Sequence, residues 1–332
     1  MSMNSAPKTT RRIWSEFVSY EELCSEHVLK MLREHELQVL VAVTPSQLED
    51  VPRLSAHMQA AGVSLGLWPM VADDHGRWGS TFNAHHFAGF ATAVSELAPE
   101  GTTIAIDLEP PITIMHGLLT GRPTAYRQLL RTNNWSVGHQ RLRDLLQLLG
   151  QRGYPCLAAA NPMLLGDGRG ESAWQWLFGT PIADLPFDAV SFMTYTSLIS
   201  GYTKGLLSRP IASSMLMQTA ASAQRQWGSR ASISLGTIGG GALGDEVPYG
   251  SIEELREDVA TALACGVTDL ALFDLSGVLS KNNPDEWISA FATTEAAETL
   301  PRVRRRARMV KVGIKQGGSA IAWYRRRRES RG

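Results

Sequence analysis

The chain of 332 residues has little cysteine and no long apolar run. Cys24, Cys156 and Cys265 are far apart and odd in number, which excludes a disulfide framework and a zinc ligand set and favours a reducing compartment. The polar start up to Arg12 is followed by no apolar core, so no secretory signal is predicted. No stretch is long enough to cross a bilayer. We therefore expect a cytoplasmic protein.

Signatures of nucleotide and metal binding are also missing. No G-x-G-x-x-G follows the first predicted strand, which weighs against a dinucleotide fold. Only His75 and His116 fall in loops at predicted strand ends, and no spaced set of His and Asp converges. A phosphosugar enzyme needs a lysine at a strand end, and the nearest one, Lys204, lies in a loop. We predict no metal and no cofactor.

The net charge of zero hides an asymmetry between the body and the end of the chain. Residues 302–332 hold twelve of the 32 Lys and Arg residues but only one of the 32 acids, Glu329. Residues 1–301 are left with 20 basic and 31 acidic groups, a net charge of −11. We predict a disordered N-terminus over 1–10, a main domain over 11–298 and a basic tail over 299–332.

Eight apolar runs typical of buried strands alternate with amphipathic helical patterns. The predicted strands are 12–18, 37–44, 63–71, 102–111, 155–162, 189–196, 231–236 and 269–275. One helix is well defined, since Ser251 and Glu254 form a capping box and Gly266 ends the pattern. Eight such units predict a closed (β/α)8 TIM barrel.

The fourth run, Ile104-Ala105-Ile106-Asp107-Leu108-Glu109-Pro110-Pro111, carries the strongest functional signal. Side chains alternate along a strand, so Asp107 and Glu109 share one face. Two carboxylates on a buried face are costly, and a protein usually keeps them for chemistry or for a cation. The alternative is that both acids meet arginines in a structural ion-pair network.

Other polar and aromatic residues follow the predicted strands at the end where barrel enzymes carry out their chemistry. They are Glu16, Trp68, Asp74, Asn161, Met193, Tyr195, Phe273 and Asp274. Each also has a structural interpretation: Met193 as barrel packing, Trp68 as core and Asp274 as a cap of a loop backbone. Tyr195 needs a polar partner wherever it is buried.

These motifs resemble those of family 18 glycoside hydrolases, the chitinase-like barrels. The fourth-strand signature D-x-x-D-x-D-x-E is kept here only as Asp107 and Glu109, with Thr102 and Ala105 at the other acidic positions. The sixth-strand M-x-Y-D becomes Met193-Thr194-Tyr195-Thr196, and Phe273 is the nearest match to the tryptophan that ends the eighth strand. An Asp-x-Glu on a barrel strand is also similar to family 25 lysozyme-type hydrolases.

The resemblance implies a mechanism for hydrolysis of an N-acetylated or related glycan. Glu109 would be the general acid, and Asp107 would orient the substrate's acetamido group, which attacks in place of a protein nucleophile. Tyr195 would donate to the acetamido oxygen, and Trp68 or Phe273 would stack on a sugar ring. From their place at the strand ends, and not from the resemblance, we also predict that Glu16, Asp74, Asn161, Met193 and Asp274 contact substrate.

Two other functions stay open. Without acids at Thr102 and Ala105, the barrel could be a non-catalytic glycan-binding protein. The glycines of 236–241 after the seventh strand could instead hold a phosphate or phosphosugar.

The basic tail 302–332 has its own predicted partner. Arg304 to Arg306 and Arg325 to Arg328 flank Trp323 and Tyr324, a composition that suits an anionic membrane at its inner face. Non-specific binding to nucleic acid and a solvated, disordered end are the alternatives.

Overall fold

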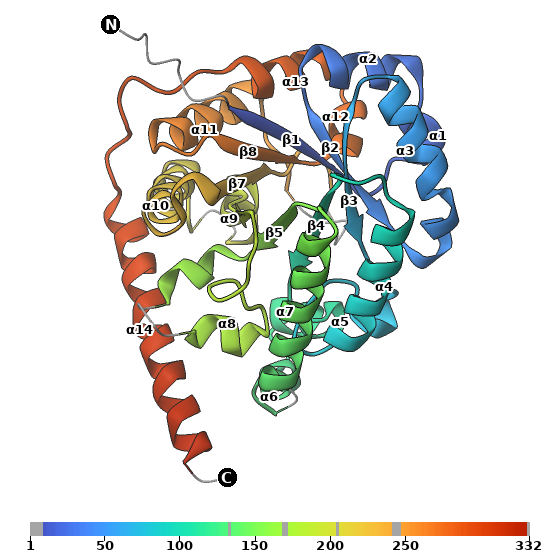
Figure 1. Cartoon of the computed structure of the whole chain (residues 1–332). Coiled ribbons are helices and arrows are strands. Elements are labelled where there is room, and N and C mark those ends of the chain that lie inside the picture. Colours follow the sequence, from blue (N-terminus) through green and yellow to red (C-terminus); the bar gives the residue numbers. More distant parts are fainter. Residues whose placement is uncertain (1–8, 132–133, 168–171, 204–205, 241–246, 331–332) are drawn as a thin grey trace, which may run out of the picture. The chain divides into compact units, whose positions relative to one another are not determined.

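The computed structural model describes residues 9–131, 134–167, 172–203, 206–240 and 247–330. Eight strands form a closed barrel in the order β1-β2-β3-β4-β5-β6-β7-β8 (Figure 1). Where their register is defined, for example between β4 and β5 and between β7 and β8, neighbouring strands are parallel. The predicted (β/α)8 barrel is therefore confirmed.

Each predicted apolar run overlaps one strand. The strands are β1 Thr10–Ser15, β2 Gln38–Val43, β3 Ser64–Pro69, β4 Thr103–Leu108, β5 Cys156–Ala160, β6 Ala189–Met193, β7 Ala231–Gly236 and β8 Asp269–Phe273. The predicted bounds of β7 are confirmed at both ends, and β1 begins two residues earlier than predicted. The disordered N-terminus predicted over 1–10 lies almost wholly outside the described residues, and Thr10 already belongs to β1.

Helices connect the strands and cover them. They are α1 Tyr20–Leu23, α2 Glu26–Glu34, α3 Val51–Ala60, α4 Ala84–Leu97, α5 Ile112–Leu119, α6 Pro123–Arg131, α7 Trp135–Gln151, α8 Ala173–Phe178, α9 Thr196–Tyr202, α10 Arg209–Trp227, α11 Ile252–Ala264, α12 Leu275–Leu279, α13 Pro284–Thr293 and α14 Arg305–Glu329. Short 3-10 helices are η1 Pro45–Asp50, η2 Asp73–His75, η3 Pro162–Gly166 and η4 Gly228–Arg230.

Helix α11 begins and ends as its sequence predicts. The Ser251 side chain accepts a hydrogen bond from the Glu254 N–H, which is the first half of the predicted capping box. The Glu254 carboxylate accepts from the Gly250 N–H at 2.8 Å, one residue before the N-cap. Gly266, with φ +86°, follows the last turn in the left-handed conformation that favours glycine. Leu255 and Val259 are fully buried, so the apolar stripe of the helix packs into the core.

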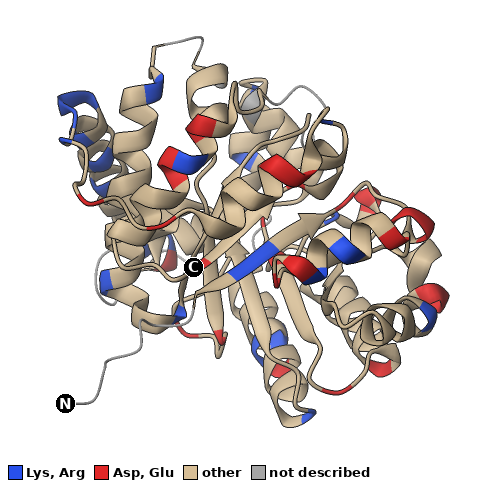
Figure 2. Ribbon diagram, turned by 90° about the horizontal axis from the view of Figure 1, so that it is seen from above, with Lys and Arg blue, Asp and Glu red and all other residues tan. Residues whose placement is uncertain are grey.

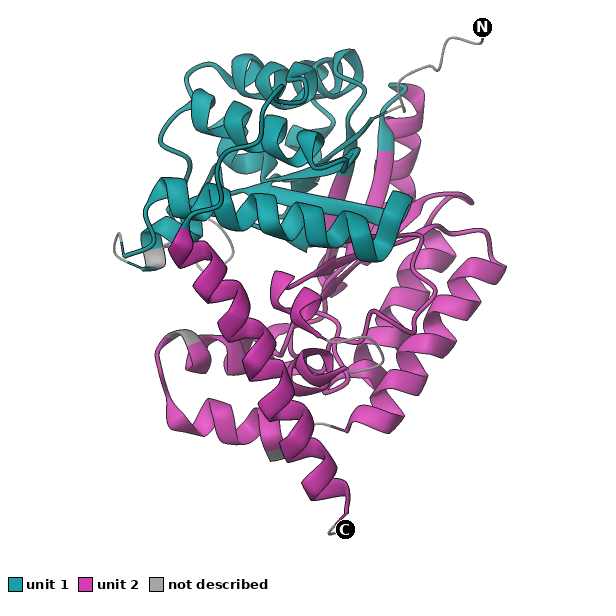
Figure 3. Ribbon diagram, turned by 90° about the vertical axis from the view of Figure 1, so that its left-hand side faces the viewer, with its two compact units in different colours: residues 1–39, 61–64, 191–304 teal, residues 40–60, 65–190, 305–332 magenta. Residues whose placement is uncertain are grey.

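The chain divides into two compact units, coloured separately in Figure 3. Unit 1 comprises residues 1–39, 61–64 and 191–304, and unit 2 comprises 40–60, 65–190 and 305–332. Strands β1, β7 and β8 belong to unit 1, and β4 and β5 to unit 2. The other three strands begin in one unit and end in the other.

A hydrogen-bonded chain of polar side chains, here called the polar column, lies within unit 1. It links Arg12, Asp269, Ser232, Ser191, Ser234 and Trp14 in that order. Arg12 pairs with Asp269 at 2.7 Å, and the Trp14 indole N–H donates to the Ser234 hydroxyl at 3.1 Å. Because β8 separates the strands of Trp14 and Ser234, the two side chains meet inside the barrel.

Candidate active site

The acid pair lies at the carboxyl end of β4. Asp107 is 7 % exposed inside the strand, and Glu109, just beyond it, is half-buried. The Gly79 N–H donates to the Asp107 carbonyl at 2.8 Å, and the Glu109 N–H donates to the Gly79 carbonyl at 3.2 Å. A Cβ on Gly79 would lie 3.0 Å from the Phe87 ring. The loop after β3 therefore holds the backbone that carries both acids, and glycine permits this close approach.

Strand register indicates on which side of the sheet the side chain of Thr103, the first residue of β4, lies. Arg12 of the polar column donates to the Gln38 side chain, so Gln38 faces the barrel interior. Leu40, two residues further along β2, faces the same way because strand side chains alternate. A Cβ on Gly66 would lie 2.5 Å from Leu40 Cδ2, so position 66 is on the same face of the sheet as the Leu40 side chain. Gly66 pairs in register with Thr103, so Thr103 also faces inward.

Alternation from Thr103 then assigns Ala105, Asp107 and Glu109 to the inward face of β4. Ile104, Ile106 and Leu108 occupy the other face and are fully buried. The sequence prediction that the two acids share a face opposite these apolar residues agrees with this register. Their catalytic roles stay predictions.

Asn161, at the end of β5, belongs to the neighbourhood of the acid pair. Asp107 is in register with Ala159, and continuing this register by two residues brings Glu109 beside Asn161. The Asn161 side-chain oxygen accepts from the Met163 N–H at 2.9 Å and so caps η3. One of its polar groups is therefore committed to the local fold, and its substrate contact stays a prediction.

Trp68 and Asp74, both predicted to bind substrate, have very different surroundings. Trp68 follows Gly66 on the inward face and is only 2 % exposed, which is the burial expected of a core residue. Asp74, in η2, has a side chain 80 % exposed, 3.9 Å from His75. A sugar platform at Trp68 and a substrate contact at Asp74 stay predictions.

In unit 1 the structure brings Tyr195 and Phe273 together. Their rings stack with centroids 5.8 Å apart and planes 22° from parallel, and Tyr195 is half-buried. A Cβ on Gly236 would lie 3.3 Å from Tyr195 Cδ1 and 2.8 Å from the Phe273 carbonyl. Because Gly236, at the end of β7, has no side chain, it leaves room for the aromatic pair. The sequence alone did not indicate this role.

Met193 and Glu16 extend this inward layer of unit 1. Met193 lies two residues beyond Ser191 of the polar column, and Glu16 lies two residues beyond Trp14. Both are half-buried. Their contacts with substrate stay predictions.

Asp274 is the N-cap of α12. Its carboxylate accepts from the Gly277 N–H at 3.0 Å and from the Ser276 hydroxyl at 2.7 Å, and the residue is 1 % exposed. Burial raises the pKa of Asp274, while these hydrogen bonds lower it in part. The capping alternative is therefore confirmed, and a substrate contact by Asp274 stays a prediction.

The described part of the loop after β7 disfavours an anion. A Cβ on Gly239 would lie 3.2 Å from Asp274 Oδ1, so an acidic side chain lies beside the glycines proposed to hold phosphate. Like charges repel, and this carboxylate already caps the start of α12. Gly241 and Lys204 lie outside the described residues.

A buried polar network in unit 1 was not predicted from the sequence. Asp258 is fully buried, and its Oδ2 accepts from the Thr196 hydroxyl, from Tyr249 at 2.8 Å and from Arg209 at 2.9 Å. Burial raises the pKa of Asp258 against the opposing effect of Arg209. The network links Thr196, the residue after Tyr195, to α10 and α11. These partners are far apart in the sequence, so no local sequence pattern predicts the network.

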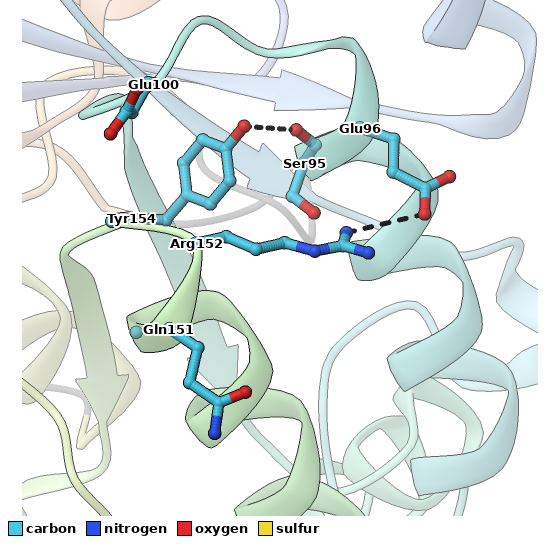
Figure 4. Close-up of a pocket in the computed structure, with 8 residues that line it drawn as sticks. Ser95, Glu96, Glu100, Gln151, Arg152 and Tyr154 are labelled. Carbon is cyan, nitrogen blue, oxygen red and sulfur yellow. Dashed lines mark hydrogen bonds and ion pairs between the residues drawn. The ribbon is translucent and has the colours of Figure 1, made fainter.

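A surface pocket of about 590 Å³ lies where α4 and α7 lead into the amino ends of β4 and β5 (Figure 4). The Tyr154 hydroxyl donates to the Ser95 carbonyl at 2.7 Å, and Arg152 pairs with Glu96 at 3.4 Å. These bonds join the two helix ends, so the pocket has a structural explanation. It lies at the opposite end of β4 from Asp107.

No group of three or more His, Cys, Asp or Glu within the described ranges could hold a metal ion. His75 stacks on His86 with centroids 4.4 Å apart, and His86 contacts His85 edge to face. These rings contact one another on and beside α4.

The fold places this protein in the class of closed (β/α)8 barrels. No family model and no curated protein matches the sequence. The glycoside hydrolase domain of PgaB (BpsB) from Bordetella bronchiseptica is similar with a TM-score of 0.52 at 12% identity, over 88% of this chain and 100% of that one. The exo-beta-1,4-mannosidase Op5Man5 from Opitutaceae bacterium strain TAV5 gives 0.52 at 9% identity, over 95% of this chain and 60% of that one.

A class V chitinase from Nicotiana tobaccum gives a lower TM-score of 0.47 at 10% identity, over 86% of this chain and 99% of that one. At these identities the likenesses show the fold alone. The specific resemblance to family 18 therefore continues to depend on the residues of β4, β6 and β8.

Proposed function

We propose that this protein hydrolyses a glycosidic bond of an N-acetylated or related glycan, with Glu109 as general acid and Asp107 orienting the acetamido group. The observation that carries the proposal is the position of the acid pair at the carboxyl end of β4, with Asp107 inside the strand and Glu109 just beyond its last residue, in a closed barrel. Two solved barrels of similar fold bear the names of a glycoside hydrolase domain and an exo-beta-1,4-mannosidase, which is in keeping with it.

The two positions differ in burial in the way the chemistry requires. Asp107 is nearly enclosed, which suits a group that holds a substrate amide in one orientation. Glu109 is half-buried, so it is partly shielded from water yet can exchange a proton with a bound ligand. Gly79 holds the backbone of both, which limits the positions that the carboxylates can take.

The reaction would proceed in two steps. Glu109 donates its proton to the glycosidic oxygen as the acetamido oxygen attacks the anomeric carbon, and the carbon–oxygen bond to the leaving sugar breaks. Water then attacks the same carbon, gives its proton to the Glu109 carboxylate and releases the acetamido oxygen. Glu109 ends in its starting protonation state.

The test is a screen of chitin-type and peptidoglycan-type oligosaccharides against wild type, Glu109→Gln and Asp107→Asn. Removing a general acid should lower kcat/KM by about 10²–10⁴-fold. Glu100→Gln is the matched control, because Glu100 is exposed in the loop before β4 and should leave cleavage unchanged. Equal cleavage by wild type and Glu109→Gln would refute the proposal.

A glycan-binding barrel without turnover is the second candidate. The observation that favours it is Ala105, which is fully buried on the inward face two residues before Asp107. The family signature has an acid at this position, and alanine supplies no charge to tune Asp107. Calorimetric binding of an oligosaccharide by both wild type and Glu109→Gln, with cleavage by neither, would establish this function instead.

A further inference from the structure

Helix α14 is the longest helix that the structure describes, with 25 residues, and it belongs to unit 2. It is the magenta helix that ends at the C-terminus in Figure 3. Residues 305–329 of the predicted basic tail are therefore helical. Ala307, Gly318 and Ala322 are its buried residues, and their spacing marks one face of the helix.

Tryptophans of unit 2 hold that buried face. The Trp174 indole N–H donates to the Ile314 carbonyl at 3.0 Å, and a Cβ on Gly317 would lie 2.8 Å from the Trp174 ring. Near the end of the helix, the Arg325 guanidinium lies over the rings of Trp135 and Trp176 at 5.6 and 5.8 Å. These contacts at two points fix which face of α14 is turned outward.

The outward face combines apolar and basic side chains. Met309, Val312 and Trp323 are 62%, 53% and 56% exposed, and their spacing of three and eleven residues places them on one side of the helix. Arg305, Arg308 and Lys315 are exposed among them (Lys and Arg are blue in Figure 2). The single acid of α14 is Glu329, at its end.

We propose that α14 binds the surface of an anionic lipid membrane, lying parallel to it with Met309, Val312 and Trp323 in the headgroup region. Basic side chains are attracted to acidic headgroups, while the apolar residues gain by leaving water. A nucleic acid would neutralise the basic residues but would leave Met309 and Val312 in water, so lipid is the better fit. No helix in the described ranges is long and apolar enough to span a membrane.

Co-sedimentation of the full chain with vesicles tests the proposal. Binding is expected to phosphatidylcholine vesicles that contain phosphatidylserine and not to phosphatidylcholine alone. The triple variant Arg305→Gln, Arg308→Gln, Lys315→Gln should bind roughly 100-fold more weakly, since each basic residue at the surface contributes roughly fivefold. Unchanged binding by this variant would overturn the proposal.

A second triple variant controls for net charge. It replaces exposed arginines of α6, α7 and α11 with the same change of charge: Arg127→Gln, Arg141→Gln and Arg256→Gln. It should bind vesicles within about twofold of wild type, because these residues lie off α14. A loss equal to that of the α14 variant would mean that overall charge, and not this helix, is responsible.

Insertion of the apolar residues has its own measurement. Brominated lipids should quench part of the tryptophan emission, and Trp323→Phe should remove that part. Absence of quenching, or binding to single-stranded RNA that is tighter than to vesicles and unaffected by Met309→Ser, would replace the membrane with a nucleic acid as the partner. None of these results depends on glycan cleavage.

Discussion

Replacing Asp258 with alanine should lower the free energy of unfolding by about 3 kcal/mol, the lower end of the 3–5 kcal/mol range for breaking a buried ion pair. Asp258 is fully buried, and the substitution removes the nearest carboxylate partner of Arg209, which keeps Glu257 at 3.7 Å. The lower end applies because the Arg209 side chain is 20% exposed and keeps a 2.6 Å hydrogen bond to the Glu254 carbonyl. Tyr249→Phe removes one donor to the carboxylate and should cost about 1.5–3 kcal/mol.

The raised pKa of Asp258 leads to a second expectation. Burying this carboxylate is costly, and Arg209 and the hydroxyls offset only part of that cost. The double variant Arg209→Met, Asp258→Leu removes both charges at once, so it should lose much less stability than the two single losses added together. The coupling between the two positions should therefore exceed about 1 kcal/mol.

Urea denaturation followed by circular dichroism measures the free energy of unfolding of wild type, of each variant named and of the single variants Arg209→Met and Asp258→Leu. The slopes of the transitions should agree among the variants, so that differences in midpoint report differences in stability. A loss below about 1 kcal/mol for Asp258→Ala would refute the assignment of the network as a buried ion pair, since that is the range of exposed pairs. Additive losses in the double variant would refute the coupling.

Two further predictions concern α14 and the cysteines. Gly313→Ala should stabilise the protein by up to about 1 kcal/mol, because nothing lies within 4 Å of a Cβ there. Gly317→Ala should destabilise it by about 1–3 kcal/mol, because its Cβ would clash with Trp174. Urea denaturation compares the two variants, and equal effects would contradict the packing of α14 against Trp174. Burial raises the pKa of Cys156 to about 12. Iodoacetamide at pH 8 should therefore label half-exposed Cys24 before Cys156 in the native protein. Mass spectrometry that finds Cys156 labelled as fast as Cys24 would contradict this.

The barrel could be predicted from sequence because its signals are local. Each strand is a short apolar run, and Ser251 and Gly266 mark the ends of α11 within a few residues of the pattern they limit. The acid pair was found for the same reason, since alternation alone places Asp107 and Glu109 on one face. The end of β7 was also predicted at the correct residue, Gly236.

The features that could not be predicted from the sequence depend on contacts between residues that are distant in the chain. Nothing near Asp258 indicates that Thr196, 62 residues earlier, donates to it. Gly79 looks like an ordinary loop glycine until its backbone is found paired with Asp107 and Glu109. The basic tail was open to a disordered interpretation because it is rich in arginine and contains four glycines. The contacts that hold α14, from Trp174 to Ile314 and from Arg325 to Trp176, join residues about 140 to 150 positions apart, so no local pattern predicts them.

The polar column has a consequence for how strand β7 finds its place. Ser232 and Ser234 point inward, and Ile233 and Leu235 point outward, where they are fully buried. A shift of one residue would expose both hydroxyls to apolar neighbours and would bring the two aliphatic side chains against Trp14 and Asp269. Backbone pairing alone tolerates several alignments of parallel strands, so the inward serines and the outward aliphatic residues favour the native register.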